Sequence, residues 1–144
     1  MFLDSQCLFS DAQAVTAAAI STNILDLGAV RDIGTGADLY VVTIVDVAMT
    51  DSGSDSTVTV SLRGDSTTTI TPDDEDTLFT IPAVSAAGTK FFHKLSPGLA
   101  SLQYQYIGLY YTPNTGNLST GSFTSFLTVG IDKVKVYADN ITIS

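Results

Sequence analysis

Apolar and polar residues alternate along much of this chain with the period of two that is typical of β-strands. The clearest case is residues 57–63, where three aliphatic side chains share one face and threonine, serine and arginine take the other. Residues 38–49 form a longer apolar run rich in valine and isoleucine, which predicts a central strand. Residues 51–55, with the sequence DSGSD, have the composition of a turn between these two strands.

The same pattern continues towards the C-terminus, with turn signals at intervals of about 10–15 residues, as in β-sandwiches and barrels. Further strands are expected at residues 67–71, 78–81, 89–95, 101–112, 123–129 and 133–138. The chain therefore shows about eight strands and leaves few residues for helices. We predict an all-β fold in a single domain of residues 1–144.

Residues 1–20 contain the one segment that could be a helix. Ser10 or Asp11 could cap a short helix over the alanine-rich stretch 11–20, but the threonine and isoleucine in that stretch lower its helical propensity. An extended N-terminal arm or an edge strand is the favoured interpretation.

Composition and charge support the strand prediction and narrow the choice of partners. The chain has 20 Thr, 15 Ser and 12 Val but only one Glu and four Gln, so β-branched residues far outnumber good helix formers. The net charge is −9, and the six basic residues are scattered. Binding to nucleic-acid phosphates or to an anionic membrane needs clustered lysine and arginine, so we expect neither. The negative charge suits solubility or a partner with a basic patch.

Cysteine usage and the first residues give no sign of export. Cys7 is the only cysteine, which excludes an intrachain disulfide and a multi-cysteine zinc site. The N-terminal stretch carries Asp4 and Asp11 but no basic residue, unlike a secretory signal. No stretch approaches the roughly 18 apolar residues of a membrane helix.

The sequence contains few residues that could form a catalytic site or a metal site. His93 is the sole histidine, which argues against multi-histidine zinc or iron sites. A hydrolase built from serine, His93 and aspartate has its ingredients, but the loop at residues 113–121 misses the G-x-S-x-G elbow by one residue. Residues 73–76 could attract a hard cation, although a solvated acidic turn after Pro72 is the favoured explanation. We expect a non-enzymatic protein with no cofactor and no metal.

Two other features have a simple structural interpretation beside a functional one. Asp46 interrupts an apolar strand, so it either needs a partner in the core or faces outwards with the alternate residues of that strand. Arg63-Gly64-Asp65 spells an adhesion tripeptide, but Gly-Asp at a strand end is an ordinary turn.

Residues 101–112 are the most aromatic segment. Tyr104 and Tyr106 alternate on one strand face, and Tyr110 joins that face if the strand continues. Exposed tyrosines could stack on sugar rings or form a protein interface. Packing at the core or rim of the sandwich is the favoured alternative, and the absence of tryptophan counts against a carbohydrate platform.

The opening stretch is the most distinctive part of the sequence. It reads MFLDSQCLFSDAQAVT, followed by STNILDLG at residues 21–28 and RDIGTG at residues 31–36. Over residues 3–40 it resembles the small capsid cement (decoration) proteins of short-tailed phages of the Bordetella-phage type. These motifs are structural rather than catalytic, and beyond them the resemblance is one of length and strand pattern.

The resemblance implies a jelly-roll domain on the outer surface of a phage head, bound to a major capsid protein of the HK97-like fold. It also implies homodimers that bridge neighbouring capsomers. On this basis we expect a structural virion protein that stabilises the capsid. A carbohydrate-binding jelly-roll module of a viral adhesion structure is the alternative, and a serine hydrolase is a third hypothesis.

Candidate contacts with the capsid or with a second copy are apolar residues near the N-terminus and tyrosines near strand ends. They are Phe2, Leu3, Leu8, Phe9, Tyr104, Tyr106 and Tyr110. An exposed apolar N-terminus would be unusual, so either a partner or the core of the domain itself should cover it.

Overall fold

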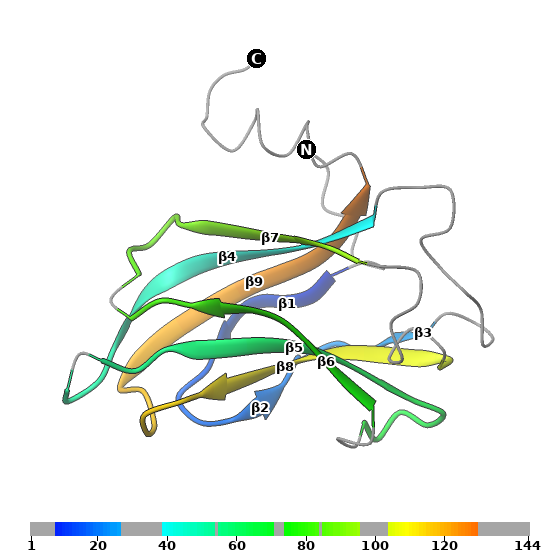
Figure 1. The fold of residues 1–144 in the computed structure, drawn as a ribbon, viewed down its shortest axis with the longest axis horizontal. Coiled ribbons are helices and arrows are strands. Elements are labelled where there is room, and N and C mark those ends of the chain that lie inside the picture. Colours follow the sequence, from blue (N-terminus) through cyan, green and yellow to red (C-terminus); the bar gives the residue numbers. More distant parts are fainter. Residues whose placement is uncertain are drawn as a thin grey trace, which may run out of the picture.

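The computed structural model describes residues 8–26, 39–53, 55–70, 74–83, 85–95 and 104–129. These residues form strands without any helix: β1 (Leu8–Ala14), β2 (Ala19–Ile20), β3 (Leu25–Asp26), β4 (Leu39–Thr50), β5 (Val58–Asp65), β6 (Asp74–Ile81), β7 (Lys90–Lys94), β8 (Tyr106–Pro113) and β9 (Thr120–Val129). All of their pairings are antiparallel, and they lie in two sheets (Figure 1). The all-β prediction is confirmed.

The order of the strands identifies the architecture. One sheet has the order β1-β9-β4-β7 and the other β2-β8-β5-β6, with β3 also paired to β8. The pairs are nested, because β1 pairs with β9, β2 and β3 with β8, β4 with β7, and β5 with β6. An antiparallel ribbon folded on itself in this way and rolled into two sheets is a jelly roll. The jelly-roll expectation is therefore confirmed, with β2 and β3 acting as two parts of one interrupted strand.

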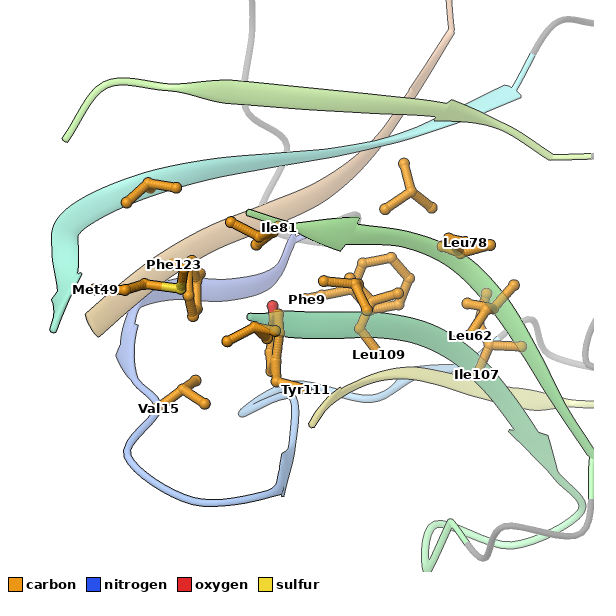
Figure 2. Close-up of a cluster of buried hydrophobic side chains, with 14 of the residues drawn as sticks. Phe9, Val15, Met49, Leu62, Leu78, Ile81, Ile107, Leu109, Tyr111 and Phe123 are labelled. Atoms are coloured by element: carbon orange, nitrogen blue, oxygen red, sulfur yellow. The ribbon is translucent and has the colours of Figure 1, made fainter. Parts of the chain in front are cut away.

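Apolar side chains from the inner faces of both sheets form the core (Figure 2). The alternation seen at residues 57–63 has its expected effect, since Val58, Val60 and Leu62 are fully buried. Tyr111 of β8 stacks on Phe123 of β9 with ring centroids 5.5 Å apart, which joins the two sheets. Burial of this apolar surface is the main force that holds the sheets together.

A chain of hydroxyl groups runs through the core. The Tyr111 hydroxyl donates to Ser125 Oγ at 2.7 Å and lies 2.8 Å from Ser10 Oγ, and Ser125 Oγ lies 2.8 Å from Thr43 Oγ1. Burial raises the pKa of Tyr111, so the phenol remains protonated and able to donate. These bonds connect β8 of one sheet to β1, β9 and β4 of the other, and they satisfy polar groups that would be costly to bury alone.

Two expectations about chain segments were wrong. Residues 67–69 of the strand expected at 67–71 form a bend, and the acidic segment expected as a turn at 73–76 belongs to β6 from Asp74 onwards. The acidic residues are tolerated because Glu75 lies opposite Arg63 of β5, where Arg63 Nε donates to Glu75 Oε2 at 2.6 Å. The strand expected at 133–138 lies outside the described residues.

At the N-terminus the structure selects the edge strand over the helix. β1 pairs with β9 through contacts such as Leu8 with Phe126 and Ala14 with Ser122. The register shifts twice along β1, and Ala12, which lies within the second shift between Ser10 and Gln13, has a positive φ of 49°. A bulge of this kind bends an edge strand and allows it to follow the curvature of the sheet.

One side of the sandwich, where β1 faces β2 and β3, is held by hydrogen bonds between the sheets, and we call it the closed side. Asn23 N donates to the Phe9 carbonyl oxygen at 2.9 Å, and Asn23 Nδ2 donates to the Leu8 carbonyl oxygen at 3.1 Å. Gln13 Nε2 donates to the Ile20 carbonyl oxygen at 2.9 Å. The closed side therefore has covered strand edges.

The opposite side, where β6 faces β7, is joined by aromatic rings, and we call it the open side. Phe79 of β6 stacks on Phe91 of β7 at a centroid distance of 5.9 Å and lies 6.5 Å from the ring of His93. All three rings are only half-buried. Among the described strands, β7 is the last strand of the four-stranded sheet and β6 is the last strand of the five-stranded sheet. The two strands belong to different sheets and are not paired with each other.

Candidate functional site

The outer face of the five-stranded sheet carries an aromatic patch on β8. Ile107, Leu109 and Tyr111 point into the core and are fully buried. Because side chains alternate along a strand, Tyr106 and Tyr110 lie on the outer face, where both are half-buried. The structure therefore brings together two of the three tyrosines expected to share a face.

Arg63 of β5 lies beside this patch in a fixed position. Its Cζ is 3.5 Å from the centroid of the Tyr110 ring, and its Nε donates to Glu75 on the other side. Only 12% of the Arg63 side chain is exposed. A guanidinium over a tyrosine ring is held by attraction to the face of the ring, so that face of Tyr110 cannot also stack on a sugar.

A glycine shapes the surface between the two tyrosines. A Cβ on Gly108 would lie 2.8 Å from Ile24 Cδ1 and 3.3 Å from Ile20 Cδ1. Without that Cβ, the two isoleucines cover β8 between Tyr106 and Tyr110. We call Tyr106, Tyr110, Arg63, Ile20 and Ile24 the tyrosine–arginine face.

Sequence reasoning missed the non-tyrosine members of this face. The alternation at residues 57–63 predicts the outward direction of Arg63 but not its contact with Tyr110, and Gly64-Asp65 of the tripeptide lies at the end of β5. Gly108 is the feature of the sequence that could have indicated the two isoleucines, because a glycine inside a strand often marks the close approach of another part of the molecule.

The outer face of the four-stranded sheet carries a second feature, an apolar row. Leu8, Phe126, Val42 and Phe92 lie in register across β1, β9, β4 and β7. Val42 and Phe126 are 0% and 1% exposed, and the half-buried side chains of Leu8, Ile44 and Phe92 pack against them. Leu8, one of the expected contact residues, belongs to this row. The outer face of an antiparallel sheet is usually polar, so the row is an unusual feature.

The remaining expected contact residues have different positions. Phe9 is 0% exposed and lies in the core, so the domain itself covers it, which was one of the two alternatives for the apolar N-terminus. Tyr104 lies just before β8 and is half-buried. Phe2 and Leu3 lie outside the described residues.

Asp46 faces outwards, which confirms one of its two alternatives. It is exposed on β4 and accepts a hydrogen bond of 2.5 Å from Thr124 Oγ1. Thr124 Oγ1 in turn accepts a hydrogen bond of 2.9 Å from the backbone N–H of Ala12. Asp46 therefore helps to hold the bulged edge strand β1 onto β9.

His93 lies among aromatic rings at the open side, and burial lowers its pKa. Within the described ranges, no group of three or more His, Cys, Asp or Glu residues could hold a metal ion. The same part of the chain holds no helix that is long and apolar enough to cross a membrane.

Comparison with known proteins identifies a relationship over most of this fold. Residues 9–127 match the model of the family Bbp16, from β1 into β9, and this span includes every residue of the tyrosine–arginine face. The name of the family points to a Bordetella phage protein, which supports a phage-related origin. No curated protein matches the chain.

Proposed function

The chain belongs to the phage-associated Bbp16 family, and from this membership we propose that it is a capsid cement protein. In this role it binds the outer surface of a phage head and bridges capsomers of the major capsid protein. The family match over residues 9–127 is the observation that carries the proposal. The jelly roll supports it, because two packed sheets offer a rigid scaffold with broad outer faces.

A cement protein stabilises a shell by mass action. It binds the assembled head and not the free subunit, so each bound copy shifts the equilibrium towards the assembled state. A molecule that contacts two capsomers also gains from the high effective concentration of its second contact. Neither effect requires a catalytic group, so the chemistry of the role is that of a protein interface.

The tyrosine–arginine face is the surface that we propose for contact with the shell. Tyrosine and arginine are enriched among the residues that dominate binding energy at protein interfaces. Arg63 is already held between Tyr110 and Glu75, so little side-chain entropy is lost when it meets a partner. The net charge of −9 would favour approach to a basic patch on the shell.

The test is co-sedimentation of the purified chain with phage heads from which its own copies have been removed. We expect saturable binding to heads and none to free capsid subunits. We expect Tyr110→Ala and Tyr106→Ala each to weaken binding by about tenfold or more, whereas Thr115→Ala, in the exposed loop after β8, leaves it unchanged. Failure to bind any head would overturn the proposal.

Stability of the head provides a second readout. Heads that carry the protein should retain their DNA at higher temperature than heads that lack it, and adding the purified chain should restore the difference. Equal heat resistance of the two kinds of head would contradict a cementing role even if binding occurs.

A further inference from the structure

The two tyrosines of the tyrosine–arginine face differ in what covers their rings. The Tyr110 ring has Arg63 over it, with the guanidinium carbon 3.5 Å from the ring centroid. Among the described residues, no ring and no cation packs on Tyr106, although both tyrosines are half-buried on the same outer face. Tyr106 therefore presents a ring for which the described part of the chain supplies no stacking partner.

The arrangement at Tyr110 shows what a tyrosine ring on this face can hold. Arg63 lies on the ring, and its Nε donates to Glu75 Oε2 at 2.6 Å. The positive guanidinium is attracted to the negative face of the ring, and the carboxylate fixes its position through a charge-assisted hydrogen bond. The arrangement has three parts, which are a ring, a guanidinium and a carboxylate.

Two of these three parts are present at Tyr106. The strand register places Asp65 of β5 and Asp26 of β3 directly opposite Tyr106, one on each side of it. Residues that lie opposite each other on neighbouring strands point to the same face of the sheet, so both carboxylates lie beside the outward ring. The part that the described residues do not supply is a cation over the ring.

Hydrogen bonds within the chain hold both carboxylates in place. Asp65 Oδ1 accepts from the backbone N–H of Thr67 at 3.1 Å and from the Thr67 hydroxyl at 3.4 Å. Gln105 Nε2 donates to Asp26 Oδ1 at 3.1 Å. These donors are neutral, and a carboxylate can accept about four hydrogen bonds, so the bonds orient the two groups without excluding a further donor.

We propose that Tyr106 receives an arginine side chain of the major capsid protein, which stacks on the ring and donates to the carboxylates beside it. The inference rests on the proposed function and specifies the chemistry of its contact. The contact repeats, with a side chain from the partner, the arrangement that Arg63 makes with Tyr110 and Glu75 inside the chain. The net charge of −9 favours the approach of a basic group.

An arginine fits this position better than a lysine or a sugar. A planar guanidinium can stack on a ring while its edge donates to more than one oxygen, whereas an ammonium is a strongly hydrated point charge without a flat face. A sugar can also stack on a tyrosine, but a neutral sugar gains no long-range attraction from the negative charge of the chain. The ring and the carboxylates together therefore favour a guanidinium.

Binding of the full-length chain to phage heads freed of their own copies tests the role of the ring. Tyr106→Leu removes the ring but keeps an apolar side chain, and Tyr106→Phe keeps the ring and removes only the hydroxyl. We expect Tyr106→Leu to lose about five times more affinity than Tyr106→Phe, because a cation is attracted to the face of a ring. Equal losses, with the wild-type chain still bound, would overturn this inference and leave the proposed function standing. Failure of the wild-type chain to bind any head would overturn both.

The same assay tests the charge beside the ring. Asp26→Asn removes the negative charge and keeps an oxygen that can accept from Gln105, and it should weaken binding by about threefold. Asp11→Asn, exposed on β1 at the closed side, changes the net charge by the same amount and should alter binding by less than about twofold. Equal effects of the two variants would show that only the overall charge matters, which would contradict a local contact at Tyr106.

The free chain gives a readout that does not involve phage heads. The probe is arginine with its amino and carboxyl groups blocked, titrated into the full-length chain while NMR follows the tyrosine ring signals. We expect saturable shifts at Tyr106, smaller shifts there with blocked lysine, and none at Tyr110, because Arg63 covers its ring. An unmoved Tyr106, or equal shifts at both tyrosines, would overturn the proposal. Shifts at Tyr106 from a sugar found on a glycan array, with none from arginine, would instead assign a carbohydrate ligand.

Discussion

The closed and open sides of the sandwich show two ways to end a pair of sheets. On the closed side, Asn23 and Gln13 donate hydrogen bonds across the gap, and the core residue beneath, Phe9, is 0% exposed. On the open side, the half-buried rings of Phe79 and Phe91 make the contact between the sheets. The comparison teaches that hydrogen bonds between the sheets complete one side, whereas on the other side packed rings alone join two strands that end their own sheets among the described residues.

The largest expected effect is a loss of core packing on the closed side. Phe9→Ala should lower the free energy of unfolding by about 3–5 kcal/mol, because it leaves a cavity under a sealed edge. Phe79→Ala on the open side should cost about half as much, since its ring is already partly in water. Urea unfolding of both variants measures the difference. A greater loss for Phe79→Ala would contradict the distinction between the sides.

The next effect concerns the hydroxyl chain that ties β8 to the closed side. Tyr111→Phe removes the bonds to Ser10 and Ser125 and should cost about 1–3 kcal/mol, because buried hydroxyls lose a partner. Tyr110→Phe is the matched control, and it should change stability by less than about 0.5 kcal/mol, since the change is on the outer face. Equal losses in thermal unfolding would show that the buried bonds contribute nothing of their own.

A smaller loss is expected from the side-chain bond that covers the β1 edge. Asn23→Ala removes the hydrogen bond to the Leu8 carbonyl oxygen and should cost about 0.5–1.5 kcal/mol. Amide hydrogen exchange should speed up in β1 more than in β7, because the closed side loosens first. Asn117→Ala, in an exposed loop, serves as the control, and an identical exchange pattern in the two variants would argue against a sealing role for Asn23.

The smallest expected effect is a pH dependence at the open side. Burial lowers the folded-state pKa of His93 below its ordinary value of 6.5, so the unfolded chain takes up a proton first as the pH falls. Stability from the neutral histidine is thus fully present above pH 6.5 and declines as the pH falls below it. His93→Gln should flatten this part of the stability profile. An unchanged slope would remove His93 as its cause.

Local features of the fold could be predicted from the sequence. The alternation at residues 57–63 corresponds to β5, and the apolar run at 38–49 corresponds to β4, because burial on one or both faces leaves a direct mark on residue order. The outward placement of Tyr106 and Tyr110 follows from the same period of two.

Long-range pairing could not be predicted in the same way. The acidic residues of β6 have the composition of a turn, and they become strand residues because Glu75 faces Arg63 across the sheet. Ile20 and Ile24 meet β8 only because Gly108 leaves room for them. The residues in these contacts are distant in sequence, so no local sequence pattern predicts that they meet.

The position of β9 has a consequence for the synthesis of the protein. β9 lies between β1 and β4, yet it is the last described strand to leave the ribosome. β1 is the first described strand, and among the described strands its only neighbour in the same sheet is β9, so that pairing waits until residues 120–129 emerge. Strand pairs so far apart in the chain form slowly, and apolar residues stay exposed while they wait. A nascent chain stalled before Thr120 should therefore be a ready substrate for chaperones, and release of the completed chain should be followed by a single, late closure of the four-stranded sheet.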